Sequence, residues 1–407
     1  MESGSRQCLF SPIRHRQNRR HLHLCLTRPA TRRRLAVRQR CDRPGRAGTA
    51  PKDTPMKSVR LSVMAAALAA VMLPLSPIKA EIFPLDTVAV GNPGNLPDHL
   101  TGLGSVGYSY HITNTEVTNA QYAAFLNTVD PTGSNPHDLY NPDMTNATGF
   151  AVVKGGINFD PQAASGTMYS PKPNYADKPV NYVSFYDAAR FANWVMTGDT
   201  ENGFYTFTDT NTLASQGVHG PNQHNGMNWI ALPSHDQWYK AAYHMNDGAT
   251  ANYYLYPTSS NDTPVVATAT PTGEIANPGI NVANYNFGAN WDGTVNLGHV
   301  TSVGSAGPES ASPYGTFDQG GNVMEWIDAV SGSRRIMRGG SLWLDESTLR
   351  STYTSEYNPL IGGSSLGFRL SSLGPITVVP LPATAWLFGS ALVGLIGVAR
   401  RHKTVIS

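Results

Sequence analysis

Residues 314–369 place pairs of glycines beside charged and aromatic residues, and this pattern constrains the fold more than any other. The segment reads YGTFDQGGNVMEWIDAV, then RRIMRGGSLW, and finally LGFRL. Glycine adopts positive φ without steric cost, so the pairs Gly320-Gly321 and Gly339-Gly340 predict tight backbone turns. The pattern therefore indicates a closely wound core of loops.

Charged side chains accompany these turns. Glu325 follows the first glycine pair, Arg338 precedes the second, and Arg369 follows Gly367 and Phe368. Buried charge is costly unless it is partnered, so we expect Glu325, Arg338 and Arg369 to share partners inside the core. Their role is either functional or structural, and buried ion pairs are more often structural.

These segments resemble the C-terminal half of the formylglycine-generating enzyme, or sulfatase-modifying factor, domain. Three upstream segments fit the same family in the same order: TEVTNAQYAAFLN, PVNYVSFYDAARFANWV and ALPSHDQWYKAAYH. The resemblance covers residues 82–372. It implies an α+β fold, a variant of the C-type lectin fold in one loop-rich domain with few short helices and strands. It does not by itself imply the activity.

The N-terminal region is predicted not to belong to the folded domain. Residues 1–55 hold 13 Arg, 1 Lys, only 3 acidic residues and all three cysteines. Met56 opens a signal peptide over residues 56–80, with a positive start, an apolar centre and the small residue Ala80 at its end. We therefore expect translation to start at Met56 and residues 1–55 to be a misassigned leader. A basic arm that binds nucleic acid is the alternative.

The C-terminal residues 376–407 resemble the PEP-CTERM sorting signal of Gram-negative bacteria. VPLPA leads into a 17-residue apolar run over 383–399, which Arg400, Arg401 and Lys403 follow. This length is near the lower limit for a membrane span, and the basic end favours the cytoplasmic side. The resemblance implies cleavage by an exosortase at the inner membrane. A plain C-terminal membrane anchor is the alternative.

Between these signals, residues 81–375 form the predicted domain. They carry 10 basic and 25 acidic residues, a formal charge of −15. So acidic a domain is a poor partner for nucleic acid and is suited to hard cations. No cysteine remains in it, so its stability cannot rest on disulfides. We expect signal peptidase and exosortase to process the protein, which then resides at the cell surface or outside the cell.

Three helix starts and one strand are predicted inside the domain. Residues 111–118 alternate like a half-buried strand. Each helix start pairs a hydroxyl residue with an amide or carboxylate three positions later, ahead of an apolar stripe that runs to Met245 in the third helix. These capping boxes are Thr118 with Gln121, Ser184 with Asp187, and Ser234 with Gln237. Residues 130–175, 198–228 and 257–282 are dense in loop-forming residues.

The family resemblance implies two calcium sites. Carried over residue by residue, the first site uses the side chains of Asp318 and Glu325 and the carbonyl oxygens of Gly321 and Val323. Calcium prefers several hard oxygen ligands of this kind. The alternative is that Glu325 pairs with Arg338 or Arg369 and no ion binds.

The second site corresponds less closely to the family pattern. Its ligands would be the side chains of Asn284 and Asn296 with the carbonyl oxygens of Tyr285 and Gly298. Asn296 stands where the family has an aspartate, which weakens the charge unless Asp292 takes that role.

The thiol chemistry of the family is excluded. The family's oxidases hold Cu(I) with two cysteine thiolates, because a soft metal needs soft ligands. The alignment places Leu344 and Leu349 at those positions, and no cysteine follows Cys41. We therefore expect neither copper nor formylglycine generation.

Two other functions remain open. A non-haem iron oxidoreductase would need two histidines and a carboxylate, with His219, His224, His235 and His244 as candidates. The accessory histidine-rich helical domain of such relatives has no counterpart here.

The second open function is that of a module that binds a glycan or peptide through its loops, and this is the leading hypothesis. The aromatic residues around the loops either contact such a ligand or fill the core. They are Tyr253, Tyr254, Tyr256, Trp291, Trp343, Tyr353 and Tyr357.

Overall fold

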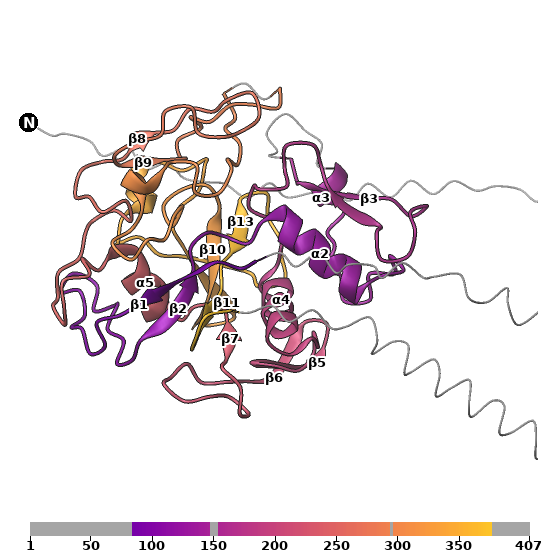
Figure 1. Cartoon of the computed structure of the whole chain (residues 1–407), viewed down its shortest axis with the longest axis horizontal. Helices are drawn as coiled ribbons and strands as arrows, with labels where there is room; N and C mark the ends of the chain where they lie inside the picture. The colour runs from indigo at the N-terminus through magenta and orange to yellow at the C-terminus, as the bar shows by residue number, and fades with distance from the viewer. Residues whose placement is uncertain (1–83, 147–153, 294–295, 377–407) are drawn as a thin grey trace, which may run out of the picture. The chain divides into compact units, whose positions relative to one another are not determined.

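The computed structural model describes residues 84–146, 154–293 and 296–376 (Figure 1). The predicted leader, signal peptide and sorting signal lie outside these residues. Over the three described ranges, no helix combines the length and apolarity needed to cross a membrane.

All three predicted capping boxes are confirmed. In each, the N-cap hydroxyl accepts the N–H of the third helical residue, whose side chain accepts the N-cap N–H. The third helix ends at Tyr243, so Met245 of the predicted apolar stripe lies beyond it. The helices are α2 (Asn119–Val129), α3 (Asp143–Asn146), α4 (Phe185–Thr197) and α5 (His235–Tyr243), with 3₁₀ turns η1 (Pro308–Ser310) and η2 (Glu346–Leu349).

Two four-stranded sheets organise the domain. The first is antiparallel in the order β1-β2-β14-β7, and the second has the order β12-β11-β10-β13 with β10 and β13 parallel. The strands of the first are β1 (Thr87–Val90), β2 (Tyr110–Thr113), β7 (Ile230–Ala231) and β14 (Ser371–Ser372). Those of the second are β10 (Met324–Ser331), β11 (Arg334–Arg338), β12 (Ser355–Tyr357) and β13 (Leu366–Phe368).

Three short strand pairs occupy segments that the sequence marks only as loops. Two of these pairs are antiparallel, and β8 with β9 is parallel. The strands are β3 (Ile157–Phe159), β4 (Tyr169–Pro171), β5 (Tyr205–Asp209), β6 (Thr212–Gln216), β8 (Val265–Val266) and β9 (Val282–Ala283). The prediction of continuous loops is therefore wrong in these places.

The strand predicted over residues 111–118 is shorter than expected, because β2 ends at Thr113. Beyond it the backbone exchanges hydrogen bonds with other parts of the chain. The Asn114 N–H donates to the carbonyl oxygen of Asp86, and the Val117 N–H donates to that of Phe368. The chain therefore leaves the sheet before α2 begins.

Strand β10 separates two apolar clusters, and its side chains alternate between them, as a strand requires. Met324 and Trp326 pack into the main cluster with residues of α2 and α4. Ile327 packs with Trp238 of α5, and Glu325 points to the same side. In Figure 1, β10, β11 and β13 run between the labels of α4 and α5. This alternation carries the acidic side chain of Glu325 into the interior.

The predicted glycine turns are confirmed at Gly321 and Gly339, which have φ values of 94° and 95°. A Cβ atom on Gly321 would lie 2.2 Å from the carbonyl oxygen of Asn284. One on Gly339 would lie 2.8 Å from the carbonyl oxygen of Gln319. Only glycine therefore fits this close approach of backbone segments.

Candidate functional site

A buried ion pair stands at the centre of the domain. Glu325 and Arg369 are essentially unexposed, and their charged atoms form two hydrogen bonds, Nε to Oε2 at 2.7 Å and Nη2 to Oε1 at 2.8 Å. The indole Nε1 of Trp238 also donates to Glu325 Oε2, at 2.7 Å. The prediction that Glu325 and Arg369 share a buried contact is confirmed.

Arg369 uses all five of its N–H donors. Besides its bonds to Glu325, it donates through Nη2 to the carbonyl oxygen of Phe317, at 2.7 Å. Through Nη1 it donates to the carbonyl oxygens of Thr113 and Asn114, at 3.1 and 3.3 Å. The guanidinium therefore links the end of β2, the loop before β10 and β10 itself, and it has no donor left for another partner.

Arg338 does not join this pair, so that part of the prediction is wrong. It lies opposite Glu325 in the β10–β11 register, but its guanidinium donates to Thr354 Oγ1 and the carbonyl oxygen of Ser351, both at 2.8 Å. Its Cζ also lies over the aromatic ring of Tyr239, 5.2 Å from the centroid. Arg338 thus holds the segment between η2 and β12 close to α5.

Two further carboxyl groups, of the half-buried Asp318 and the buried Glu116, lie near the ion pair. Asp318 Oδ2 accepts the N–H of Gly304 at 2.6 Å, and burial raises the pKa of Asp318 to about 6. Burial, and next the charge of Asp318, raise the pKa of Glu116 well above its usual value. Neither oxygen of Glu116 has a hydrogen-bond partner. We did not predict a role for Glu116. It lies in the alternating segment 111–118, in the same phase as the buried Ile112.

A second feature is a groove of about 430 Å³ beside the first turn of α5. Hydroxyl, amide, imidazole and carboxylate groups face it together with an aromatic ring. Its lining residues are Ser105, Val106, Gly107, Tyr108, Gln216, Gly217, Val218, His219, Ser234 and Asp236.

Asp328 of β10 does not line this groove, but it holds two residues of one wall in place. Its fully buried carboxylate accepts from His219 Nε2 at 2.9 Å, from Arg335 Nη1 at 2.9 Å, and from Gln216 Nε2 at 3.2 and 3.3 Å. The imidazole also packs on the ring of Phe204, with centroids 4.8 Å apart. His219 is therefore held by specific contacts and is not a freely solvated loop residue.

The opposite wall is fixed as well. Asp236 Oδ1 accepts the N–H of Gly104 at 2.8 Å, and Gln237 Nε2 donates to the hydroxyl of Tyr108 at 3.1 Å. Burial raises the pKa of Tyr108 to about 12, so its hydroxyl remains protonated at neutral pH. The polar groups of the groove are thus held in place before any ligand arrives.

Comparison with known protein families identifies the family of this domain. The model of the sulfatase-modifying factor enzyme 1-like domain matches residues 104–372, which is more than half of the chain. The chain belongs to the sulfatase-modifying factor enzyme 1-like domain family. No curated protein matches significantly.

Three solved structures resemble the sulfatase-modifying factor-like chain. CarF is 20% identical, with a TM-score of 0.43, over 73% of this chain and 100% of its own. Treponema denticola variable protein 1 is 17% identical, with a TM-score of 0.39, over 71% and 95%. PvdO from Pseudomonas aeruginosa is 14% identical, with a TM-score of 0.37, over 71% and 92%.

The first calcium group predicted from the family fits poorly in this sulfatase-modifying factor-like domain. Both oxygens of Glu325 accept from Arg369, which is the ion-pair alternative, and Asp318 accepts from Gly304. The N–H of Gly321 donates to the carbonyl oxygen of Gly339, which joins the two glycine turns. The charge of Glu325 is therefore already balanced without an ion.

The second predicted group fits in part. Asn284 is buried, and its Oδ1 has no partner, whereas its Nδ2 donates to the carbonyl oxygen of His299. Asn296 is exposed, in a left-handed conformation with φ of 56°. The carbonyl oxygen of Tyr285 accepts from Gly288, at 3.1 Å. Of the ligands predicted for this group, the Asn284 oxygen is buried and has no hydrogen-bond partner.

Asp292, the alternative ligand of the second calcium group, already has other partners. Asp292 Oδ2 accepts from Lys154 Nζ at 2.9 Å and from the hydroxyl of Tyr175 at 2.6 Å. Tyr175 also lies 3.2 Å from His299 Nε2. Asp292 therefore belongs to a separate ion pair.

The two predicted thiol positions of the family hold apolar side chains in separate environments. Leu349 is fully buried with Tyr256, Ala283 and Tyr285. Leu344 is half-buried and packs against the main core. Neither side chain can bind a metal or attack a thiol.

The four histidines proposed for iron have different neighbours. His219 binds Asp328, His224 contacts the side chain of Asn225, and His244 Nδ1 lies 2.8 Å from the hydroxyl of Tyr314. His235 Nε2 is buried without a partner. In the part of the chain that the structure describes, no three histidine, cysteine or acidic side chains gather as a metal-binding group.

Of the seven aromatic residues proposed for ligand contact, two lie in the interior. Tyr256 and Trp291 are buried, and only Tyr357 is exposed, at 38%. The others are half-buried: Tyr253, Tyr254, Trp343 and Tyr353. The groove aromatic Tyr108 was not among the predicted residues, because no local pattern marks it.

Proposed function

We propose that this member of the family is an exported binding module that holds a hydroxyl-rich ligand, such as a glycan, in the groove beside α5. The proposal rests on the groove wall that the buried carboxylate of Asp328 holds in place. One buried carboxylate orients Gln216 and His219, which both line the groove. Fixed polar groups bind with a smaller loss of conformational entropy than mobile ones.

The groove chemistry suits a glycan. Ser105, Tyr108 and Ser234 offer hydroxyl groups, Gln216 offers an amide, and Asp236 offers a carboxylate. Sugar hydroxyls both donate and accept, so they match a mixed set of this kind. The ring of Tyr108 adds an apolar surface with a polar edge.

Binding is favoured over nucleophilic catalysis at this groove. His219 Nε2 faces Asp328, and its Nδ1 is buried without a partner. A histidine that activates a nucleophile would hold a hydroxyl or thiol at that second nitrogen. The iron oxidoreductase alternative has no cluster of ligands in its favour among the described residues.

The rest of the proposal concerns fold, place and cofactor. We propose that the domain is a variant of the C-type lectin fold, whose loops display the ligand site. Signal peptidase and exosortase would process the protein before it reaches the cell surface. Calcium remains the proposed structural ion, with the free Asn284 oxygen in its support.

A glycan screen with the purified protein tests the function. Calorimetry with the best glycan should show that Gln216→Ala and Tyr108→Phe each weaken binding about tenfold, because each removes an oriented hydrogen-bonding group. Thr212→Ala is the matched control, since Thr212 is exposed on the same β5–β6 hairpin but does not line the groove. Equal affinity in all three variants would refute the site.

A further inference from the structure

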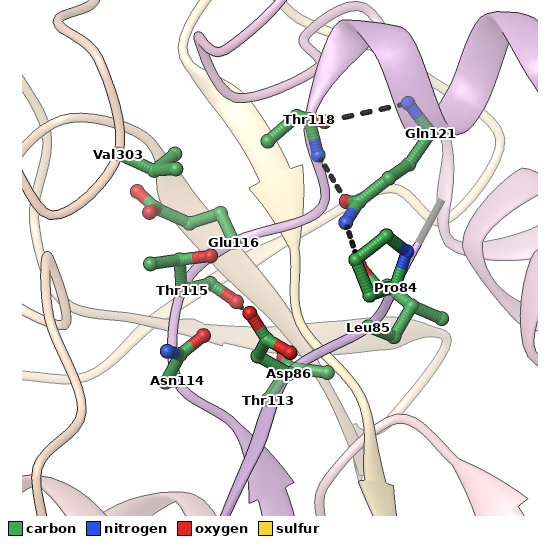
Figure 2. A pocket seen from close by; sticks show the side chains of 10 residues that line it. All are labelled: Pro84, Leu85, Asp86, Thr113, Asn114, Thr115, Glu116, Thr118, Gln121 and Val303. Carbon is green, nitrogen blue, oxygen red and sulfur yellow. Dashed lines mark hydrogen bonds between the residues drawn. The ribbon is translucent and has the colours of Figure 1, made fainter. Parts of the chain in front are cut away.

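A second cavity, of about 220 Å³, lies where the chain passes from β2 to α2, and it shares no lining residue with the groove. Figure 2 shows its walls, in which the capping box of Thr118 and Gln121 is tied to the carbonyl oxygen of Pro84. None of its lining residues is basic. They are Pro84, Leu85, Asp86, Thr113, Asn114, Thr115, Glu116, Thr118, Gln121 and Val303.

Glu116 is the unusual member of this set. Its side chain is 1% exposed, and neither carboxylate oxygen has a hydrogen-bond partner. Arg369 lies near but cannot help, because its five N–H groups go to Glu325 and to three carbonyl oxygens. Burying an unpartnered carboxylate is costly.

A proton alone would not satisfy Glu116. A protonated carboxyl group is a hydrogen-bond donor and needs an acceptor. Neither oxygen of Glu116 has a hydrogen-bond partner in another residue. A bound cation would instead use both oxygens as they stand.

The surroundings of Glu116 carry an excess of negative charge. Glu325 balances Arg369, which leaves Asp318 and Glu116 without a basic partner. Asp318 accepts from Gly304, the residue after the cavity residue Val303. Three acidic side chains, those of Glu325, Glu116 and Asp318, therefore lie near the single guanidinium of Arg369.

The cavity also offers hard donors. Besides Glu116, the residues that line it include Asp86, Asn114 and Thr115, whose side chains carry oxygen atoms. Oxygen ligands of mixed charge suit Ca²⁺ better than a transition metal. We propose that this cavity is a cation site in which Glu116 is the central ligand for Ca²⁺.

This site differs from both calcium groups implied by the family, since neither contains Glu116 or Asp86. It also lies apart from the groove residues, so the glycan proposal does not depend on it. The distinction can be tested by removing Glu116 while leaving Glu325 and Asn284 intact.

The experiment is calorimetric titration of Ca²⁺ into chelator-treated, full-length protein, together with thermal melts. Glu116→Gln should lose one bound Ca²⁺, or at least about tenfold in affinity, because it removes the ligand charge. Without Ca²⁺, the same variant should melt no lower than the unsubstituted protein, because it replaces a buried carboxyl group that has no hydrogen-bond partner in another residue. A variant that merely damaged the fold would melt lower.

Two more variants keep the test decisive. Asp86→Asn, at an exposed lining residue, should weaken Ca²⁺ binding, and it reports on the site even if Glu116→Gln fails to fold. Glu356→Gln, at an exposed residue of β12, should leave binding unchanged. Unaltered Ca²⁺ binding in both Glu116→Gln and Asp86→Asn would overturn the proposal, as would failure of the unsubstituted protein to bind Ca²⁺. Loss of binding only in Asn284→Ala would also overturn it.

Discussion

Single residues in this domain combine charge with nearly complete burial. Glu325, Arg369 and Glu116 are buried and Asp318 is half-buried, although only the first two neutralise each other. Buried charges contribute little to stability as a pair but cost much when one partner is removed. Substitutions of these charged residues should therefore have large effects on the stability of the domain.

The central ion pair should be sensitive to Glu325→Gln. This change leaves the Arg369 guanidinium buried with a neutral partner, so we expect the free energy of unfolding to fall by about 3–5 kcal/mol. Urea denaturation measures it. Glu356→Gln breaks an exposed pair with Arg334, at 3.8 Å, and should cost under about 1 kcal/mol. Similar losses in the two variants would contradict a buried-pair explanation.

His235 should make stability depend on pH. Burial, and next the charge of Arg338, lower the pKa of His235 to about 4. The unfolded histidine, with its pKa near 6.5, therefore takes up a proton first as the pH falls. The stability that His235 contributes is present above that pH and is lost between about pH 6.5 and 4.

The measurement compares the unsubstituted protein with His235→Gln by urea denaturation at several pH values. The protein should lose stability relative to the variant as the pH falls through this window. Asp318 acts in the opposite direction, since burial raises its pKa to about 6, but its effect cancels in the comparison. A constant difference from pH 7 to pH 4 would refute the assignment.

Among the elements, helix starts are specified locally and strands are not. The capping box of α4 satisfies two backbone groups through Ser184 and Asp187, at 2.7 and 3.2 Å. By contrast, β10 and β13 pair in parallel although residues 332–365 separate them in the chain. Helix boundaries could therefore be predicted, whereas the order of the strands could not.

Ser184→Ala should destabilise the domain by about 1 kcal/mol, because it removes the hydroxyl that caps α4. Ser184→Gly should cost only a few tenths of a kcal/mol, as glycine is tolerated at this position. Thermal or urea denaturation compares the two. An alanine variant as stable as the glycine variant would indicate that tertiary packing, not the cap, defines the start of α4.

At the scale of the whole molecule, an acidic domain with few basic residues should respond to cations. Ca²⁺ that binds only the folded state at a hundredfold excess over its Kd stabilises by about 2.7 kcal/mol. The melting temperature should therefore rise with Ca²⁺ and fall with chelator. Asn284→Ala should reduce this rise if its free oxygen is a ligand. Metal-free protein whose melting ignores Ca²⁺ would remove calcium from both proposals.

Processing is the second prediction at this scale. The signal peptide predicted over residues 56–80 and the sorting signal over 376–407 should give a mature chain that begins at Glu81 and ends near Pro382 when an exosortase is present. Intact-mass measurement of the exported protein checks both ends. A mass that includes residues 1–55 would refute the start at Met56.

The sequence by itself determined the features that depend on neighbouring residues. The capping boxes at Thr118, Ser184 and Ser234 and the glycine turns were predicted because local hydrogen bonding and backbone freedom define them. The motif order gave the family and thus the extent of the domain, and the lack of cysteine after Cys41 excluded thiol chemistry.

Only the tertiary structure decided which side chains meet. Glu325 and Arg338 are opposite in register, yet the guanidinium that reaches Glu325 is that of Arg369. His219 and Asp328 are 109 residues apart, and only the packing of the β5–β6 hairpin region on β10 joins them. The cavity beside Glu116 likewise combines residues near β1, β2 and Val303. Such contacts depend on long-range packing, which no local spacing in the sequence encodes.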